Sequence, residues 1–266
     1  MILLTGYKGF IGNNFYTELK KNQNVMLIEK EDCFSFLRDF NNWSELSLVI
    51  HQGAISNTRE NDWKKLEQYN VNFSISLFNN IRKYKIPIRY ASSASVYGNS
   101  QPKTDPLNKY AKSKLVLDTW VLDNIDSFYN IQGLRYFNVY GNYENHKIPL
   151  GQASPISKFI YDSKHLNEIK IFEGSENIYR DFICVKDVVE VAINNTRSSG
   201  IYDLGSCLTY SFEDIAKLIQ KKFGGVVKNI EFPKNLKDNY QFYTKSSDSW
   251  DGYRFTKIEE YLDSIV

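Results

Sequence analysis

The sequence predicts an α/β fold with a doubly wound parallel sheet and a smaller C-terminal part. Two observations predict it. Short apolar runs alternate with amphipathic segments of helical period through residues 1–140, and a glycine-rich turn separates the first apolar run from the first amphipathic segment. After residue 140 the alternation loosens, and no repeat or long linker marks an independent second domain.

Each element of the first part follows from its own pattern. Residues 1–5 form an apolar run that ends in a glycine turn, which is typical of a buried strand. From Phe10 to Leu19 apolar residues recur at helical spacing, which predicts a helix. Further strands are expected at 25–28, 48–51, 86–91 and 131–135, and further helices at 63–84, 110–125 and near 155–163.

Composition excludes several classes of partner. The 33 Lys and Arg residues nearly balance 31 Asp and Glu residues, so the net charge of +2 gives no strong field for nucleic acid. Cys33, Cys184 and Cys207 are odd in number and lack metal-ligand spacing, so neither a disulfide framework nor a metal site is expected. The first apolar run is too short for a signal peptide or a membrane span. We therefore expect a cytoplasmic protein with no membrane partner.

The turn from Gly6 to Gly12 is the first motif that carries chemistry. Gly6 permits a tight turn, Gly9 lets a pyrophosphate approach the backbone, and Gly12 lets the helix pack against the strand. The helix that begins with Phe10 and Ile11 then offers free N–H groups and about half a positive charge to the phosphates. A strand, this turn and an amphipathic helix together predict a Rossmann-like dinucleotide site.

Three charged residues bear on the choice between NAD and NADP. Glu29 ends the second strand, where a carboxylate favours the free ribose of NAD over a 2′-phosphate. Lys8 and Lys30 are ammonium groups able to pair with that phosphate. We predict a modest preference for NADP, with NAD as the alternative. The other cofactor-contacting candidates are Gln52, Gly53 and Ala54, which follow the third strand.

The second chemical motif is Tyr110 with Lys114, spaced i and i+4 on one helix face. A free phenol has a pKa of about 10, and lowering it by about 3 units requires roughly 4 kcal/mol. A neighbouring ammonium and a positive nicotinamide ring can supply this together. A hydroxyl-rich strand end upstream, around Ser93, offers a hydrogen bond to the oxygen being oxidised. The set predicts hydride transfer to or from an alcohol.

We therefore divide the chain by function. Residues 1–140 are expected to bind the dinucleotide, with a return contribution from about 181–206. Residues 141–266 are expected to be mainly a substrate-binding part.

These motifs resemble those of the extended short-chain dehydrogenases/reductases. Within that group the chain is similar to the family of ADP-glycero-manno-heptose 6-epimerases, and the likeness spans nearly its whole length. The most specific matches are Arg135-Tyr136-Phe137-Asn138-Val139-Tyr140-Gly141, His146-Lys147, Phe172-Glu173-Gly174-Ser175-Glu176-Asn177, Arg180-Asp181-Phe182, Phe232-Pro233, Leu236-Lys237 and Tyr240-Gln241.

The resemblance implies an isomerase that works on a nucleotide-activated sugar, with ADP-heptose as the expected substrate. It also implies that the enzyme assembles as a homo-oligomer. It implies hydride-transfer chemistry for Ser93, Tyr110 and Lys114, and a second acid/base role for Lys147. It also implies an active-site or cofactor contact for Asn70. The implied substrate contacts are Ser56, Ser93, Asn138, His146, Lys147, Phe172, Glu173, Arg180 and Tyr240.

The chain departs from the family pattern in three places, and other functions stay open. Segments 31–46 and 98–106 are short, and Lys8 replaces a small residue. A 4-epimerase of another nucleotide hexose would share the Tyr110 chemistry but need no Lys147. A 4,6-dehydratase would place an acidic pair where Ala94-Ser95 stand. A non-catalytic dinucleotide-binding protein would often have lost the tyrosine or the lysine.

Overall fold

The computed structural model describes residues 1–234 and 240–265. Leu236 and Lys237, which belong to the family resemblance, lie outside the described residues.

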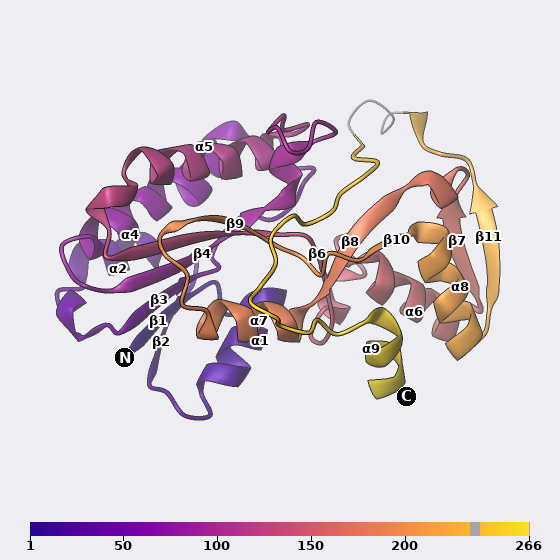
Figure 1. Cartoon of the computed structure of the whole chain (residues 1–266), viewed down its shortest axis with the longest axis horizontal. Helices are drawn as coiled ribbons and strands as arrows, with labels where there is room; N and C mark the ends of the chain where they lie inside the picture. The colour runs from indigo at the N-terminus through magenta and orange to yellow at the C-terminus, as the bar shows by residue number, and fades with distance from the viewer. Residues whose placement is uncertain (235–239, 266) are drawn as a thin grey trace.

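A six-stranded parallel sheet forms the N-terminal half (Figure 1). Its strand order is β2-β1-β3-β4-β5-β9. The strands are β1 Ile2–Thr5, β2 Val25–Ile28, β3 Leu48–His51, β4 Pro87–Ser93, β5 Asn130–Tyr136 and β9 Gly200–Leu204. The chain moves outward from β1 to β2 and then returns to β3 on the other side of β1. The order therefore reverses at β1, where α/β sheets of this kind bind ligands.

Helices cover both faces of this sheet, as predicted for a doubly wound fold. One face packs against α4 and α5, and the other against α1 and α7. The helices of this half are α1 Phe10–Leu19, α2 Cys33–Asp39, α3 Trp63–Leu66, α4 Phe73–Ile81, α5 Lys109–Asp123 and α7 Val185–Asn194. Strand β9 and helix α7 come from beyond residue 180, so the chain returns to the first layer after building part of the second.

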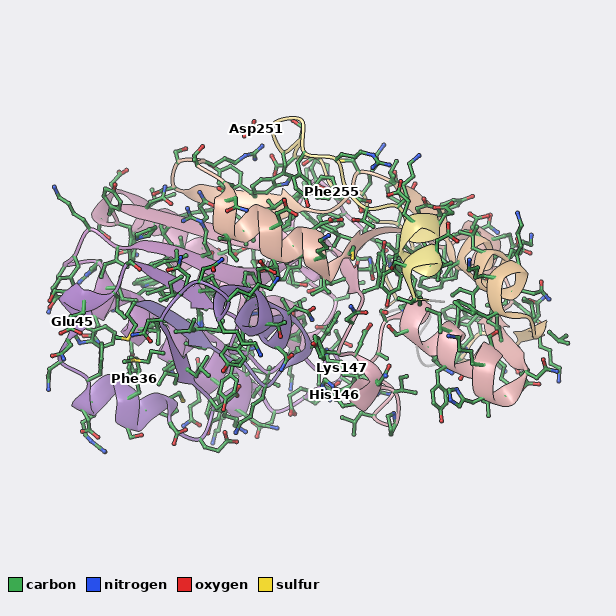
Figure 2. The ribbon with its side chains drawn as sticks, turned by 90° about the horizontal axis from the view of Figure 1, so that it is seen from below. Phe36, Glu45, His146, Lys147, Asp251 and Phe255 are labelled. Atoms are coloured by element: carbon green, nitrogen blue, oxygen red, sulfur yellow. The ribbon has the colours of Figure 1, made fainter. Side chains whose placement is uncertain are left out.

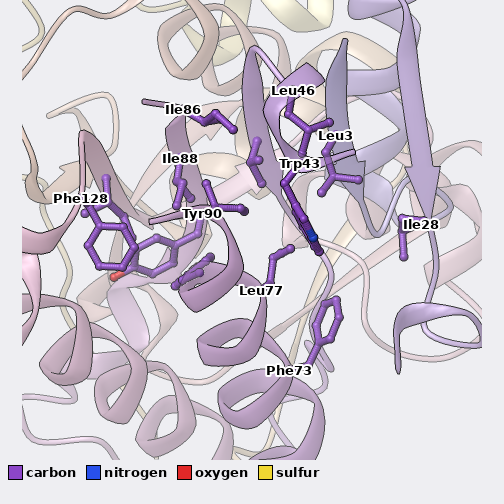
Figure 3. Packing of buried hydrophobic residues seen from close by; sticks show 14 of the residues in the cluster. Leu3, Ile28, Trp43, Leu46, Phe73, Leu77, Ile86, Ile88, Tyr90 and Phe128 are labelled. Carbon is purple, nitrogen blue, oxygen red and sulfur yellow. The ribbon is translucent and has the colours of Figure 1, made fainter. Parts of the chain in front are cut away.

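The largest apolar cluster lies between the sheet and the helices α2, α4 and α5 (Figure 3). Leu3 and Ile88 from the sheet face Leu77 of α4, and all three side chains are fully buried. Trp43 fills the end of this layer near α2. Burying each such side chain contributes about 1.5–3 kcal/mol, so this layer fixes the sheet on which the site is built.

The C-terminal part has its own core and two small sheets (Figure 1). The first has the order β10-β8-β6, and the second pairs β11 with β7. Its elements are β6 Asn138–Tyr140, α6 Pro155–Leu166, β7 Glu168–Phe172, β8 Tyr179–Cys184, β10 Thr209–Ser211, α8 Phe212–Phe223, β11 Val226–Ile230 and α9 Ile258–Ser264.

The helix expected at 63–84 differs from the prediction in one informative way. It runs from Trp63 to Ile81 but widens into a π turn over Glu67–Asn72. Asn70 lies in this turn, buried, and bonds to groups outside its own helix. Single π turns are frequent at functional sites.

The short segment 31–46 contains α2, which sequence patterning did not predict. Phe36 and Trp43 from this segment pack edge to face, with ring centroids 5.4 Å apart. The described residues contain no helix long and apolar enough to cross a membrane.

Candidate active site

A cleft of about 460 Å³ opens where the strand order reverses. Its walls come from the glycine turn, the ends of β2 to β5, the start of α5 and the loop before α6. The cleft thus joins the two halves of the chain, and it is large enough for a ligand of small-molecule size.

Most of the predicted site residues line this cleft, and some do not. Those that line it are Gly6, Gly9, Phe10, Ile11, Gly12, Glu29, Lys30, Gln52, Gly53, Ala54, Ser56, Ser93, Tyr110, Lys114, Asn138 and Lys147. Those that are not among its lining residues are Lys8, Asn70, His146, Phe172, Glu173, Arg180 and Tyr240.

The glycine turn is shaped so that no side chain fits at two of its three positions. A Cβ on Gly6, which has φ +71°, would lie 2.6 Å from the Cα of Gly53. A Cβ on Gly12 would lie 2.0 Å from the carbonyl oxygen of Gly6. At Gly9 the nearest atom would be 3.4 Å away, so packing does not require a glycine there. The absence of a side chain at Gly9 instead leaves the cleft open.

The start of α1 is prepared for an anion. Gly9 is its N-cap residue and gives no side-chain cap, so the first turn of the helix presents backbone N–H groups toward the cleft. The first turn also holds no acidic side chain. An uncapped helix start beside a glycine cradle fits the pyrophosphate of a dinucleotide.

The far end of the cleft contains the residues that bear on NAD and NADP. The backbone N–H of Lys8 donates to Glu29 Oε1 at 2.6 Å, so the carboxylate is fixed at the rim. The Lys8 side chain itself lies over the ring of Tyr7, 5.8 Å from its centroid. Lys30 lines the cleft, and its ammonium is 4.7 Å from the centroid of Tyr69.

Helix α2 supplies a wall that the sequence did not predict. Cys33 from α2, Tyr69 and Phe73 line the same end of the cleft. The short segment 31–46 therefore contributes Cys33 to the cleft, next to the aromatic side chains of Tyr69 and Phe73.

Tyr110 belongs to α5, the helix that carries the predicted proton-transfer residues. It lies at the start of α5, where Asn108 caps the helix by accepting from the N–H of Ala111 at 2.8 Å. Burial raises the pKa of the Tyr110 phenol, a hydrogen bond with the Ser93 hydroxyl lowers it, and the charge of Asp118 raises it. Tyr110 is therefore protonated at neutral pH unless a further positive charge enters the cleft.

Lys114 lies one turn later on the same face and is almost completely buried. Its ammonium donates to the carbonyl oxygen of Ala91 at 2.7 Å. Burial lowers the pKa of Lys114 to about 8, against the opposing charge of Asp118. The ammonium is thus held at the end of β4, beneath Ser92 and Ser93, and remains mostly charged at pH 7.

Asp118 continues the stripe of Tyr110 and Lys114 by one more turn. Its carboxylate accepts from Tyr90 Oη at 2.9 Å and from Ser92 Oγ at 2.9 Å, and it pairs with Arg135 at 2.9 Å. This fully buried carboxylate ties α5 to both β4 and β5. Asp118 is not among the predicted site residues, although the i, i+4 spacing that relates Tyr110 to Lys114 leads one turn further to it.

A buried chain of hydrogen bonds connects the glycine turn with α5. His51 contacts Thr5 Oγ1 at 2.6 Å and Ser74 Oγ at 2.8 Å, and Ser74 donates to the carbonyl of Asn70. Asn70 then donates to Ser113 Oγ at 3.0 Å.

Two further bonds show what this chain holds. Ser113 donates to the carbonyl of Tyr110, and Ile55 and Asn70 bond in both directions. Asn70 therefore fixes the first turn of α5 and the loop after β3 instead of facing the cleft.

Lys147 reaches the cleft from a 3₁₀ turn at Asn145–Lys147, whereas its neighbour His146 does not line it. Figure 2 shows both side chains where the N-terminal and C-terminal parts meet. The ammonium of Lys147 lies 5.4 Å from the centroid of Phe10, beside the glycine turn. Burial lowers the pKa of Lys147, and the nearby charge of Glu144 raises it. The structure brings this lysine into the same cleft as Tyr110.

Three of the predicted substrate residues, Phe172, Arg180 and Tyr240, belong to a separate cluster in the C-terminal part. Arg180 is buried on β8, and its guanidinium lies 5.4 Å from the centroid of Tyr240 and 5.7 Å from that of Phe212. Burial lowers the pKa of Arg180 to about 10. Phe172 packs near this cluster through Phe232, with ring centroids 5.0 Å apart.

Taken together, the fold and the cleft define a dinucleotide-binding enzyme of the dehydrogenase type. The cradle at Gly6 and Gly12 has room for backbone but not for side chains, and the cleft continues to a buried Tyr–Lys pair. The residues present therefore fit a nicotinamide dinucleotide: the turn at Gly9 and the start of α1 would hold its phosphates, and Tyr110 and Lys114 would serve its redox chemistry.

Comparisons with known proteins agree with this class. Residues 2–205 match the NAD dependent epimerase/dehydratase family. The chain is 35% identical to the ADP-L-glycero-D-manno-heptose-6-epimerase of Brachyspira hyodysenteriae, over 92% of this chain and 89% of that protein. It is 32% identical to the enzyme of the same name from Alkalilimnicola ehrlichii, over 92% and 88%.

Among solved structures, the ADP-L-glycero-D-manno-heptose-6-epimerase of Helicobacter pylori superposes with a TM-score of 0.85. It covers 99% of this chain and 94% of its own at 24% identity, which supports the fold. The chain belongs to the NAD dependent epimerase/dehydratase family. The predictions of an NAD(P)-dependent isomerase and of a Rossmann-like parallel sheet are thereby confirmed.

Proposed function

We propose that this enzyme is a nucleotide-sugar epimerase whose substrate is ADP-glycero-manno-heptose and whose reacting carbon is carbon 6. One observation carries the proposal: Ser93, Tyr110, Lys114 and Lys147 all line the cleft that begins at the glycine turn. The two relatives at 32–35% identity, which bear the heptose-6-epimerase name, support the substrate.

The chemistry needs a transient oxidation of the C6 alcohol. When bound, the nicotinamide supplies a hydride acceptor and donor together with a positive charge. Ser93 orients the alcohol by hydrogen bonding, and Tyr110 takes its proton as the alcohol becomes a ketone. Lys114, held on the carbonyl of Ala91, keeps a positive charge close to this proton transfer.

Inversion requires that hydride returns to the other face of the ketone. The reacting carbon of the heptose is exocyclic, so two protein groups can serve its two faces. We assign the proton donor of the second step to Lys147, because its ammonium is half-buried in the cleft and its pKa is lowered toward the working pH. Tyr110 and Lys147 then exchange roles in the reverse direction.

A 4-epimerase is the alternative that the same cleft supports least well. It would present both faces of its ring to Tyr110 by turning the sugar, and Lys147 would have no task. The presence of Lys147 among the lining residues favours the 6-epimerase.

Several finer features remain predictions. They are the preference for NADP over NAD, the homo-oligomer, the cytoplasmic location, the division at residue 140, and the substrate contacts of Arg180 and Tyr240.

The test is a panel of ADP-, UDP-, GDP- and dTDP-sugars incubated with the purified enzyme, with products resolved by NMR. We expect epimerisation at carbon 6 of ADP-D-glycero-D-manno-heptose and little conversion of the hexoses. Preferential epimerisation of a hexose at carbon 4 would overturn the assignment of the substrate while leaving the Tyr110 chemistry in place.

A further inference from the structure

A buried carboxylate, that of Glu144, lies three residues before Lys147 at the wall of the cleft. Its side chain is 3% exposed. Ser154 donates to it through both its backbone N–H and its hydroxyl, the latter at 2.8 Å, and the Ser157 hydroxyl donates at 2.5 Å. Glu144 is not among the residues predicted from the sequence, and it has no role in the mechanism proposed above.

These bonds place Glu144 at the start of a helix. Ser154 is the N-cap of α6, and its hydroxyl accepts from the N–H of Ser157 at 3.2 Å. The partial positive charge of a helix start stabilises a carboxylate by about 0.3–1 kcal/mol, or up to about 2 kcal/mol when partly buried. Burial raises the pKa of Glu144, while its serine donors and the charge of Lys147 lower it.

Glu144 also closes the loop that carries Lys147. The N–H of Lys147 donates to the backbone carbonyl of Glu144 at 2.9 Å, and the N–H of Gln152 donates to the carbonyl of Lys147 at 3.1 Å. The side chain of Glu144 bonds the far end of the same loop at Ser154. The loop from 144 to 154 is thus fastened at both ends by one residue.

The charge of Glu144 raises the pKa of Lys147 although the two side chains form no direct ion pair. No ion pair joins the two within 4.0 Å in the part of the chain that the structure describes. The other ionisable groups that line the same cleft are Glu29, Lys30, Cys33, Tyr69, Tyr110, Lys114 and Tyr136. His146 precedes Lys147 in the chain, and Arg59 donates to the loop carbonyls of Leu150 and Gly151. Glu144 is the acidic group on the loop itself.

We propose that Glu144 is a positioning residue that holds Lys147 in the cleft and keeps it protonated until it donates to the substrate. This rests on the proposed function, in which Lys147 is the second acid/base. The carboxylate is satisfied by Ser154 and Ser157, so the ammonium of Lys147 stays available to an oxygen in the cleft. Glu144 thereby opposes the desolvation that lowers the pKa of the lysine.

The first experiment measures the pKa of Lys147 without relying on activity. Lysines are reductively methylated with ¹³C, the Lys147 signal is assigned with Lys147→Met, and its shift is followed against pH by NMR. We expect E144Q to lower the pKa of Lys147 by about 1 unit, the small end of the effect of a neighbouring opposite charge. Glu213→Gln, which removes an equal charge paired with Lys217 on α8, should leave it unchanged. An unchanged pKa in E144Q would overturn the proposal.

The second experiment follows turnover against pH. In the direction in which Lys147 donates, the high-pH limb of kcat should move to lower pH in E144Q by the same amount. Ser157→Ala keeps the charge and removes one hydrogen bond, so it should leave the limb in place but reduce kcat at every pH. If E144Q does not fold, Glu144→Asp takes its place: a retained pKa with reduced kcat supports the positioning role, and wild-type kcat overturns it. If no sugar is epimerised at all, the proposed function fails, but the NMR titration still decides the effect of Glu144.

Discussion

The two walls of the cleft hold the proposed proton-transfer groups by different means. Tyr110 and Lys114 stand on α5, a helix of 15 residues that buried bonds tie to β4, β5 and the π turn. Lys147 stands on a 3₁₀ turn of three residues, in a loop closed by one carboxylate. The first wall is redundantly fixed, whereas the second depends on few contacts. In the proposed mechanism the oxidation step therefore uses groups on the rigid helix α5, and the inversion of configuration uses a group on the loop.

The largest loss of activity should come from a change in the wall formed by α5, which carries Tyr110 and Lys114. Tyr110→Phe removes only the hydroxyl that transfers the proton in the proposed mechanism, and the buried ring still fills its place. We expect turnover to be abolished while dinucleotide affinity and unfolding temperature stay close to wild type. Steady-state kinetics with calorimetry checks this, and activity within about tenfold of wild type would mean that another group is the acid/base, since such groups contribute about 10²–10⁴-fold.

A change in the loop wall, the loop 144–154 that carries Lys147, should give a smaller loss of activity. Lys147→Met keeps the length of the side chain and its packing over Phe10, but it removes the proton. We expect a loss of about 10²–10⁴-fold in epimerisation, with dinucleotide binding intact. The comparison of the two walls breaks if this variant epimerises ADP-D-glycero-D-manno-heptose at a near-normal rate.

The glycine turn allows the effects of fold and ligand to be separated with matched variants. Gly12→Ala places a Cβ 2.0 Å from the Gly6 carbonyl, so it should destabilise the protein and weaken the cofactor site together. Gly9→Ala meets no atom closer than 3.4 Å, so it should fold normally and lose affinity for the dinucleotide alone. Thermal unfolding and calorimetry on both variants check this, and a stable Gly12→Ala with wild-type affinity would count against the cradle.

The smallest effect concerns the choice of cofactor. Glu29 is fixed by the N–H of Lys8, so Glu29→Ala should improve NADP binding by removing a carboxylate from the rim. Lys8→Ala should weaken NADP selectively by a few fold if the predicted NADP preference is correct, because an exposed ion pair contributes about 0.2–1 kcal/mol. Titration with both dinucleotides decides it, since equal weakening of NAD and NADP would exclude a role for Lys8 at the 2′-phosphate.

The contrast between the helix α5 and the loop that carries Lys147 also explains how much of the molecule the sequence can predict. The parallel sheet, the glycine turn and Tyr110 with Lys114 follow from local periodicity and spacing, because each signal lies within one strand–turn–helix unit. The helix α2 could not be predicted in this way, because Phe36 and the nearby Trp43 show no clear helical period in the sequence. Only the tertiary packing that buries them reveals their place.

The loop wall shows the limit of local patterns more clearly. Lys147 was identified by family resemblance and not by its own surroundings. Glu144 could not be predicted locally, because its partners, Ser154 and Ser157, lie on another element and their bonds exist only in the folded chain. Asp118 differs from Glu144, because it lies one turn beyond Lys114 and the same helical spacing indicates it from the sequence alone.

The central claim is transient oxidation of an exocyclic alcohol with return of the same hydride. It is tested most directly by incubating the enzyme with ADP-D-glycero-D-manno-heptose in D₂O and resolving the product by NMR. The account predicts inversion at carbon 6 with no solvent deuterium on that carbon, because the hydrogen leaves and returns without exchanging with water. Inversion with deuterium at carbon 6, or no inversion of this sugar, would contradict it.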